Sequence, residues 1–267
     1  MGLDLVRRTG TLAVVRYTAW GLSDVGRKRD HNEDSYLVNP RLGLYAVADG
    51  MGGHQGGELA SKMALEVLEG EIEAARETGS LPDKGGNGNA GRIIEKAAQR
   101  ASEMIFAAAQ GDPDLNGMGT TLTGMLVHRG RAYVAHVGDS RCYLFRDGKC
   151  LQLTEDHSWV NEQVRAGLLS AEDARESKFK HIITRSVGFE RHVSVDGVTL
   201  AIEPGDCFLI CSDGLSNLVE GEEIARVLGA HFYKRVPPLL VDLANDRGGD
   251  DNVTVVLMHA ANDARRS

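Results

Sequence analysis

The sequence predicts an α+β protein in which antiparallel strands dominate and helices lie outside them. Short runs rich in β-branched and aromatic residues fill both ends of the chain, and several are joined by two-residue turns. Such short turns can connect only antiparallel neighbours. Two long stretches with apolar residues at helical spacing interrupt these runs, and no interdomain linker or internal repeat is visible.

The first third of the chain predicts three strands followed by a long helix. Strands are expected over residues 12–22, 35–38 and 42–48, the last of which stops at Asp49-Gly50. From about Gly57 to Glu77, apolar residues recur every three or four positions, which predicts an amphipathic helix. Its apolar positions are Leu59, Ala60, Met63, Ala64, Val67, Leu68 and Ile72.

Residues 80–91, SLPDKGGNGNAG, predict a mobile loop, because their Gly, Asn and Pro content offers little to bury. The loop contains a GxGxxG pattern, but a dinucleotide fingerprint must follow a strand inside a βαβ unit, so we assign it no cofactor. A second helix follows, and we expect the two helices to pack as a hairpin. Its apolar face is Ile93, Ile94, Ala97, Ala98, Ala101, Met104, Ile105 and Ala108.

From Thr120 the chain predicts strands joined by tight turns. The strands are expected over 120–128, 131–137, 141–146 and 149–153, with turns such as Arg129-Gly130 and Asp147-Gly148 between them. Residues 155–185 are polar and are expected to form a mostly helical insertion between strands. Strands over 193–201, 206–211 and 253–258 follow, with helices near 222–229 and 235–246.

Composition limits the classes of function. The chain of 267 residues has 30 Lys+Arg and 38 Asp+Glu, a net charge of −8 that disfavours a general nucleic-acid binder. No apolar run is long enough to span a membrane, and Met1 to Val15 does not resemble a signal peptide. The four cysteines have neither metal-ligand spacing nor an obvious disulfide pairing, so we expect a cytoplasmic protein.

Acidic residues stand at the ends of the predicted strands. Each alone is most simply a turn residue, because Asp-Gly and Gly-Asp are common turn dipeptides. If the strands share a layered core, however, their ends converge on one rim, where clustered carboxylates repel one another unless cations lie among them. The residues concerned are Glu33, Asp34, Asp49, Asp139, Asp213 and Asp251.

An oxygen-only ligand set without Cys or His spacing favours a hard ion such as Mg²⁺ or Mn²⁺. Such ions deprotonate water near neutral pH and bind the oxygens of a transferring phosphoryl group. The sequence therefore predicts a metal-dependent enzyme that acts on a phosphate ester.

Seven motifs together resemble the metal-dependent type 2C protein serine/threonine phosphatases, in particular their bacterial branch. They occur in the family's order from about Tyr17 to His259: RDHNED, ADGMGGHQGGE, GMGTTLT, HVGDSRCYLFRDG, LTEDHS, CSDGLSN and GGDDNVTVV. The resemblance implies an αββα sandwich of two mainly antiparallel sheets. It also implies one catalytic domain over 1–267, with a core of about 17–259 and a flap over about 155–185.

The resemblance implies a site of two catalytic Mn²⁺ or Mg²⁺ ions and a third, weaker one. Asp49 matches the bridging ligand, and Gly50 matches the glycine that offers its backbone carbonyl. Asp213 and Asp251 match the other ligands of the first ion, and Asp139 helps Asp213 with the third. Glu33 and Asp34 match the acidic pair that holds the second ion, partly through water, and Arg29 matches the phosphate clamp.

The implied reaction is a single displacement at phosphorus by a hydroxide that bridges the metals, without a phosphoenzyme. The leaving alkoxide must be protonated, and animal members have a histidine directly after the bridging Asp-Gly where this chain has Met51. His54, His31 or a metal-bound water could serve as the general acid, and the residues do not decide among them.

The implied partners are phosphorylated proteins and a cognate serine/threonine kinase. A catalytically inactive phosphoprotein-binding module and a metal-dependent hydrolase of small phosphate esters remain alternatives. Simpler structural roles are expected elsewhere: His157 at the entry of the flap, Trp20 and Trp159 in packing, and Ser140, Arg141 and Asn252 in support of the acids.

Overall fold

The computed structural model describes residues 14–81 and 89–263. It contains eleven strands in these ranges: β1 Val14–Asp24, β2 Asp34–Asn39, β3 Leu44–Met51, β4 Gly119–Thr120, β5 Leu122–His128, β6 Arg131–Val137, β7 Arg141–Arg146, β8 Lys149–Gln152, β9 Asp196–Ala201, β10 Cys207–Cys211 and β11 Val253–Asp263. The helices are α1 His54–Glu77, α2 Ala90–Gly111, α3 Trp159–Arg165, α4 Ala171–Glu176, α5 Asp213–Ser216, α6 Gly221–Ala230 and α7 Val236–Asp246, with short 3₁₀ turns at Pro113–Leu115 and Tyr233–Arg235.

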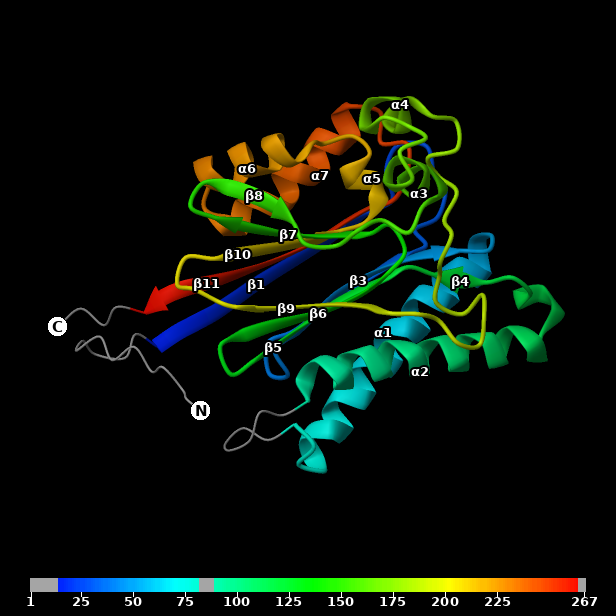
Figure 1. Ribbon diagram of the computed structural model, residues 1–267, viewed down its shortest axis with the longest axis horizontal. Helices are drawn as coiled ribbons and strands as arrows, with labels where there is room; N and C mark the ends of the chain where they lie inside the picture. Colours follow the sequence, from blue (N-terminus) through cyan, green and yellow to red (C-terminus); the bar gives the residue numbers. More distant parts are fainter. Residues whose placement is uncertain (1–13, 82–88, 264–267) are drawn as a thin grey trace.

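The strands form two antiparallel sheets that pack face to face. One sheet has the order β1-β11-β10-β7-β8, and the other has β2-β3-β5-β6-β9, with β4 beside β3. Apolar side chains from both sheets fill the space between them, among them Tyr45, Met125, Phe208 and Met258. Helices α1 and α2 cover the outer face of the β3 sheet, and α6 and α7 cover that of the β10 sheet (Figure 1). The predicted αββα sandwich is confirmed.

The local predictions agree with the structure in most places. Arg129 and Gly130, like Asp147 and Gly148, have positive φ, as two-residue type I′ turns require. Helices α1 and α2 pack against each other as a hairpin. Cys150 pairs in register with Phe145, and all four cysteines are free thiols.

Two local predictions need correction. The insertion at 155–185 is not mostly helical, because only α3 and α4 are helices and the remaining residues are irregular. Of the expected mobile loop 80–91, residues 82–88 lie outside the described residues. Leu81 is buried in the core beside α1 and α2, and Ala90 already belongs to α2, so both ends of that segment have apolar side chains to bury.

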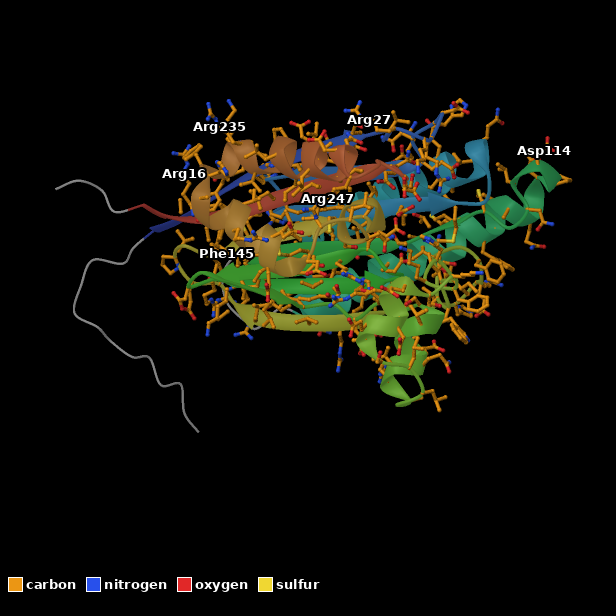
Figure 2. The ribbon with its side chains drawn as sticks, turned by 90° about the horizontal axis from the view of Figure 1, so that it is seen from above. Arg16, Arg27, Asp114, Phe145, Arg235 and Arg247 are labelled. Carbon is orange, nitrogen blue, oxygen red and sulfur yellow. The ribbon has the colours of Figure 1, made fainter. Side chains whose placement is uncertain are left out.

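The antiparallel order brings one set of strand ends to the same end of the molecule. The register pairs Asp24 with Val253 and Cys211 with Arg141 in one sheet, and Asp34 with Asp49 in the other. The flap helices lie at this end, whereas Arg16 and Phe145 lie at the opposite end (Figures 1 and 2). No helix among the described residues is long and apolar enough to cross a bilayer.

Candidate active site

The acidic residues at the strand ends meet around one cavity of about 600 Å³. Asp49 lies near the end of β3, Asp139 follows β6, Asp213 begins α5 directly after β10, and Asp251 precedes β11. All four line the cavity, together with Arg29, His31, Glu33, Gly50 and Asn252. Because both sheets end here, the acids come together although they lie up to about 200 residues apart in the sequence.

Asp34 lies behind this cavity at the start of β2. Its side chain is buried, and its Oδ2 accepts a hydrogen bond of 2.8 Å from the hydroxyl of Ser212. Ser212 in turn accepts from the backbone N–H of Thr254, so one hydroxyl links β2, the end of β10 and β11. The structure therefore places Asp34 as a buried carboxylate that supports the rim of the cavity.

Three carboxylate oxygens at this end are buried without a hydrogen-bond partner among the described residues. They are Oδ1 of Asp34, Oδ1 of Asp139 and Oδ1 of Asp213. A buried acceptor without a partner costs about 1–3 kcal/mol, and more when it is charged. A cation that contacts these oxygens would remove that cost, so the donor set fits a hard metal ion.

The pKa values of the aspartates also indicate that this end of the molecule has too few positive charges to balance its carboxylates. Burial, together with the neighbouring carboxylates of Asp213 and Asp251, raises the pKa of Asp34 to about 7, although hydrogen bonds from Thr254 and Ser212 oppose the shift. The pKa of Asp49 is also far above its usual value, because of burial and the charges of Asp34 and Asp213. Burial likewise raises the pKa values of Asp139 and Asp213. Bound divalent cations would reverse this direction.

The side chains at this rim do not by themselves complete the coordination of a metal ion. No group of three His, Cys, Asp or Glu side chains within residues 14–81 and 89–263 already has the geometry to hold an ion. One reason is visible, because Asp251 Oδ2 is 2.7 Å from Arg29 Nη2 and is occupied by this ion pair. A second is that the expected ligand set includes the Gly50 carbonyl and water, which complete the coordination of hard ions.

Glycine lets three segments approach closely beside the cavity. A Cβ on Gly57, in the first turn of α1, would collide with Glu33 Oε2, and a Cβ on Gly50 would collide with the Gly57 carbonyl. The Gly50 N–H also donates to the Glu33 carbonyl at 3.2 Å. Glu33 is thus held against the end of β3, which explains why glycine is required at positions 50 and 57.

Asn252 ties the loop that carries Arg29 and Glu33 to the start of β11. Its Oδ1 accepts from the Glu33 N–H at 2.8 Å, and its Nδ2 donates to the carbonyls of Val25 and His31, each at 2.9 Å. The side chain is 5% exposed, so these bonds are shielded from water. The expected supporting role of Asn252 agrees with these contacts.

The other expected supports differ in what they contact. Ser140 lies 2.8 Å from the hydroxyl of Thr121, and that hydroxyl accepts from the Asp49 N–H. Arg141 bonds none of the strand-end acids, because its guanidinium is taken by Asp156 at 2.6 to 3.1 Å. Arg141 therefore holds the entry of the flap, and it supports a strand-end acid only through its charge, which opposes the raised pKa of Asp139.

The histidines separate into two groups. His31 is exposed and lines the cavity, whereas the side chain of His54, the first residue of α1, lies outside the described residues. His157 is buried away from the cavity, where its Nδ1 accepts from the Gly138 N–H at 3.0 Å and its Nε2 lies 3.1 Å from Asp196. These contacts fix the entry of the flap, as the sequence suggested.

The two tryptophans also differ. Trp20 is half-buried and packs against the core beneath α6 and α7. Trp159 is 37% exposed at the start of α3, with its ring edge-on to the exposed Phe179. Its expected packing role is thus only partly correct, because its contact is confined to the flap.

The flap contributes three residues to the cavity that the sequence did not indicate: Lys180, His181 and Ile183. Asn217 was also missed, and its Nδ2 donates to Asp213 Oδ2 at 2.9 Å. Asn217 stands four residues after Asp213 in the CSDGLSN motif, a spacing of one helical turn that could have indicated the contact. No comparable signal marks the flap residues, because the irregular path of residues 177–187 has no periodicity.

Comparison with known proteins places this geometry in a family. Residues 26–246 match the family model described as protein phosphatase 2C. The serine/threonine phosphatase stp of Listeria innocua is 38% identical over 243 residues, which cover 88% of this chain and 93% of that protein.

Solved structures agree. A crystal structure of the Mycobacterium tuberculosis serine/threonine phosphatase PstP/Ppp has a TM-score of 0.83 at 35% identity, covering 93% of this chain and 100% of that one. The catalytic domain of PstP in complex with two manganese ions has a TM-score of 0.81 at 34% identity, with coverage of 93% and 100%.

Proposed function

This chain belongs to the protein phosphatase 2C family, and from that premise we propose that it removes phosphate from phosphoserine and phosphothreonine in proteins with the help of Mn²⁺ or Mg²⁺. The main support from the molecule itself is the set of buried carboxylate oxygens without partners beside a cavity of about 600 Å³. A rim with this deficit of positive charge suits divalent ions. We further propose that the protein acts in the cytoplasm, against a serine/threonine kinase.

We assign the ligand roles as the family pattern predicts them. Asp49 would bridge two ions, with the Gly50 carbonyl beside it. Asp213 and Asp251 would complete the coordination of the first ion, Glu33 and Asp34 would hold the second partly through water, and Asp139 with Asp213 would bind a third. Two observations support this assignment: Asp34, Asp139 and Asp213 each have an oxygen without a partner among the described residues, and the pKa values of the aspartates are raised.

When bound, such ions lower the pKa of water and stabilise negative charge on the phosphoryl oxygens. Arg29 would bind the substrate phosphate, which its planar guanidinium can contact with two N–H groups. In this structure Arg29 is paired with Asp251, so that pair must open before either residue can perform its proposed role. The pair is half exposed and is therefore weak enough to exchange.

The leaving serine or threonine alkoxide needs a proton. His31, His54 and a metal-bound water are the candidates from the sequence, and His181 joins His31 as a described histidine that lines the cavity. We also propose that residues 1–267 act as one catalytic domain, with 155–185 as a flap beside the site. The contribution of three flap residues to the cavity lining supports that arrangement.

Phosphate release from a phosphothreonine peptide in Mn²⁺ tests this function, with EDTA and a phosphotyrosine peptide as controls. We expect release that requires Mn²⁺ and favours phosphothreonine. A folded, metal-loaded protein that binds the peptide without turnover would instead be a phosphoprotein-binding module. Preference for small phosphate esters over phosphopeptides would indicate a small-molecule hydrolase.

A further inference from the structure

A second cavity opens beside the catalytic one. It has a volume of about 740 Å³ and lies between the flap helices α3 and α4 on one side and α5 and α6 on the other (Figure 1). We call it the flap groove. Its lining shares Asp139, Lys180, Asp213, Asn217 and Leu218 with the catalytic cavity, so the two are continuous. A chain whose phosphoresidue lies in the catalytic cavity can extend directly into this groove.

The walls of the flap groove are partly apolar and are held together by ion pairs. Val160 and Val164 of α3 and Ala174 of α4 face Leu218 and Val219. Arg175 of α4 pairs at 3.0 Å with Glu220, at the N-terminus of α6, and so joins the flap to the opposite wall.

Arg247, labelled in Figure 2, stiffens the wall formed by α6. It binds Glu223 with two N–H groups at 2.6 and 2.7 Å and also donates to the Leu218 carbonyl. This wall is therefore built before any ligand arrives.

Lys180 differs from every other cation that lines the flap groove. Arg141, Arg175 and Arg247 each form an ion pair, with Asp156, Glu220 and Glu223 respectively. Lys180 is half-buried at the junction of the two cavities and has no ion pair with a carboxylate of the described residues. Its charge reaches as far as Asp250, whose pKa it helps to lower, although the Lys28 ion pair lowers that pKa more.

We propose that the flap groove binds the polypeptide segment next to the phosphoresidue, and that Lys180 pairs with an acidic side chain of that segment. This inference rests on the proposed phosphatase function. Asp156, Glu220 and Glu223 of the groove walls are already paired with arginines, and Asp139 and Asp213 at the junction are proposed metal ligands. Once metal is bound there, the charge left for a peptide side chain at the junction is the lysine ammonium. An acidic residue would satisfy it, whereas a basic residue would meet a like charge in a narrow space.

A charge-reversal experiment tests the proposal. Phosphothreonine peptides would carry Asp, Ala or Lys at each of the nearest positions on either side of the phosphoresidue, and kcat/KM would be measured for each. The native chain should favour Asp over Lys at one position by about fivefold, because a partly exposed ion pair contributes up to about 1 kcal/mol. Lys180→Glu should reverse this ratio. The ratio compares two substrates of one enzyme, so a general loss of activity cancels.

Lys178→Glu is the matched control. Lys178 is exposed on the same flap and lines neither cavity. Its replacement by Glu changes the net charge of the protein by the same amount as Lys180→Glu. It should leave the Asp to Lys ratio unchanged. As a second variant, Ala174→Phe should narrow the flap groove and raise KM for a long phosphopeptide more than for one truncated on the preferred side.

Three outcomes would overturn the inference. An unchanged ratio in Lys180→Glu, with equal losses on all peptides and on p-nitrophenyl phosphate, would place Lys180 at the phosphate itself. If Lys178→Glu changed the Asp to Lys ratio of kcat/KM as much as Lys180→Glu does, the preference would come from the overall charge of the flap and not from a contact with Lys180. If the native chain showed equal kcat/KM for the Asp, Ala and Lys peptides at every position, no acidic residue of the substrate would pair with Lys180. If the native chain releases no phosphate from any peptide in Mn²⁺, the phosphatase proposal itself fails, which is a different result.

Discussion

Strand β10 has an aspartate near each of its ends, the buried Asp206 and the half-buried Asp213, and the two have opposite surroundings. Asp206, just before the strand, is 1% exposed, yet its carboxylate accepts from Arg146 Nε at 2.7 Å, from Arg146 Nη2 at 2.6 Å and from the Glu203 N–H at 2.7 Å. Asp213, two residues after the strand, has a buried Oδ1 without a partner among the described residues, and other carboxylates surround it.

The difference between Asp206 and Asp213 indicates that the end of the sandwich at Asp206 has a structural role, whereas the end at Asp213 has a functional one. A buried carboxylate is tolerable where a guanidinium and a backbone N–H bind both oxygens, because these contacts offset the loss of hydration. At the other end the same residue type is left short of donors and close to like charges, which destabilises the folded state. Proteins keep such arrangements where a ligand or a reaction needs them.

The largest effect is expected for Asp213→Asn. The change removes a charge proposed to contact two ions, so phosphate release should fall by at least about 100-fold, or about 3 kcal/mol in the barrier. The metal-free variant should be at least as stable as the native chain, because one repelling charge is gone. Mn²⁺ titrations of activity and thermal unfolding in EDTA would measure both. Full activity with an unchanged Mn²⁺ requirement would refute the ligand assignment.

Asp206→Asn should have the reverse consequence at the other end of β10. The amide cannot accept from both Arg146 donors, so the free energy of unfolding should fall by about 2–3 kcal/mol. Activity per folded molecule should change little, since the residue lies at the opposite end of the strand. Urea unfolding beside a kinetic assay at low temperature would check this. A large loss of kcat in the folded variant would mean that the two ends are coupled.

The metal-free protein should lose stability as pH rises from about 4 to 7. The pKa of Asp34 is raised to about 7 in the folded state, so within this window the folded chain binds more protons than the unfolded one. Stability is therefore fully present below the ordinary aspartate pKa and is lost as pH rises through 7, by up to about 4 kcal/mol for a shift of about three pKa units. Denaturant unfolding in EDTA at several pH values measures the slope, which Asp34→Asn should reduce. A slope of opposite sign in the native chain would contradict this account.

The smallest change in stability is expected for Arg29→Ala. Its ion pair with Asp251 is half exposed, so the free energy of unfolding should change by less than about 1 kcal/mol, while kcat/KM falls because the phosphate loses a contact. Arg29→Lys should recover little activity, because an ammonium cannot reproduce the planar, two-point contact. If Arg29→Ala lowered the free energy of unfolding as much as Asp206→Asn does, the ion pair of Arg29 with Asp251 would be needed to stabilise the fold.

Local chemistry made much of the fold predictable. The two-residue turns at Arg129-Gly130 and Asp147-Gly148 follow from residues that tolerate positive φ, and the α2 helix follows from its apolar spacing. The prediction that residues 155–185 are mostly helical was wrong. Their polar composition allows short helices, but they have no apolar face whose packing would stabilise a long one. Leu81 was missed because a single apolar residue in a loop shows no period.

The sequence by itself determined which acids stand at strand ends, since that depends only on where each apolar run stops. It also determined the family, through motifs that keep their order along the chain. Only the tertiary structure decided that Asp206 meets an arginine and Asp213 does not, because these partners come from distant segments brought together by sheet register. The same holds for Lys180, which lies at the junction of two cavities without an ion pair among the described residues, because its place depends on how the flap folds.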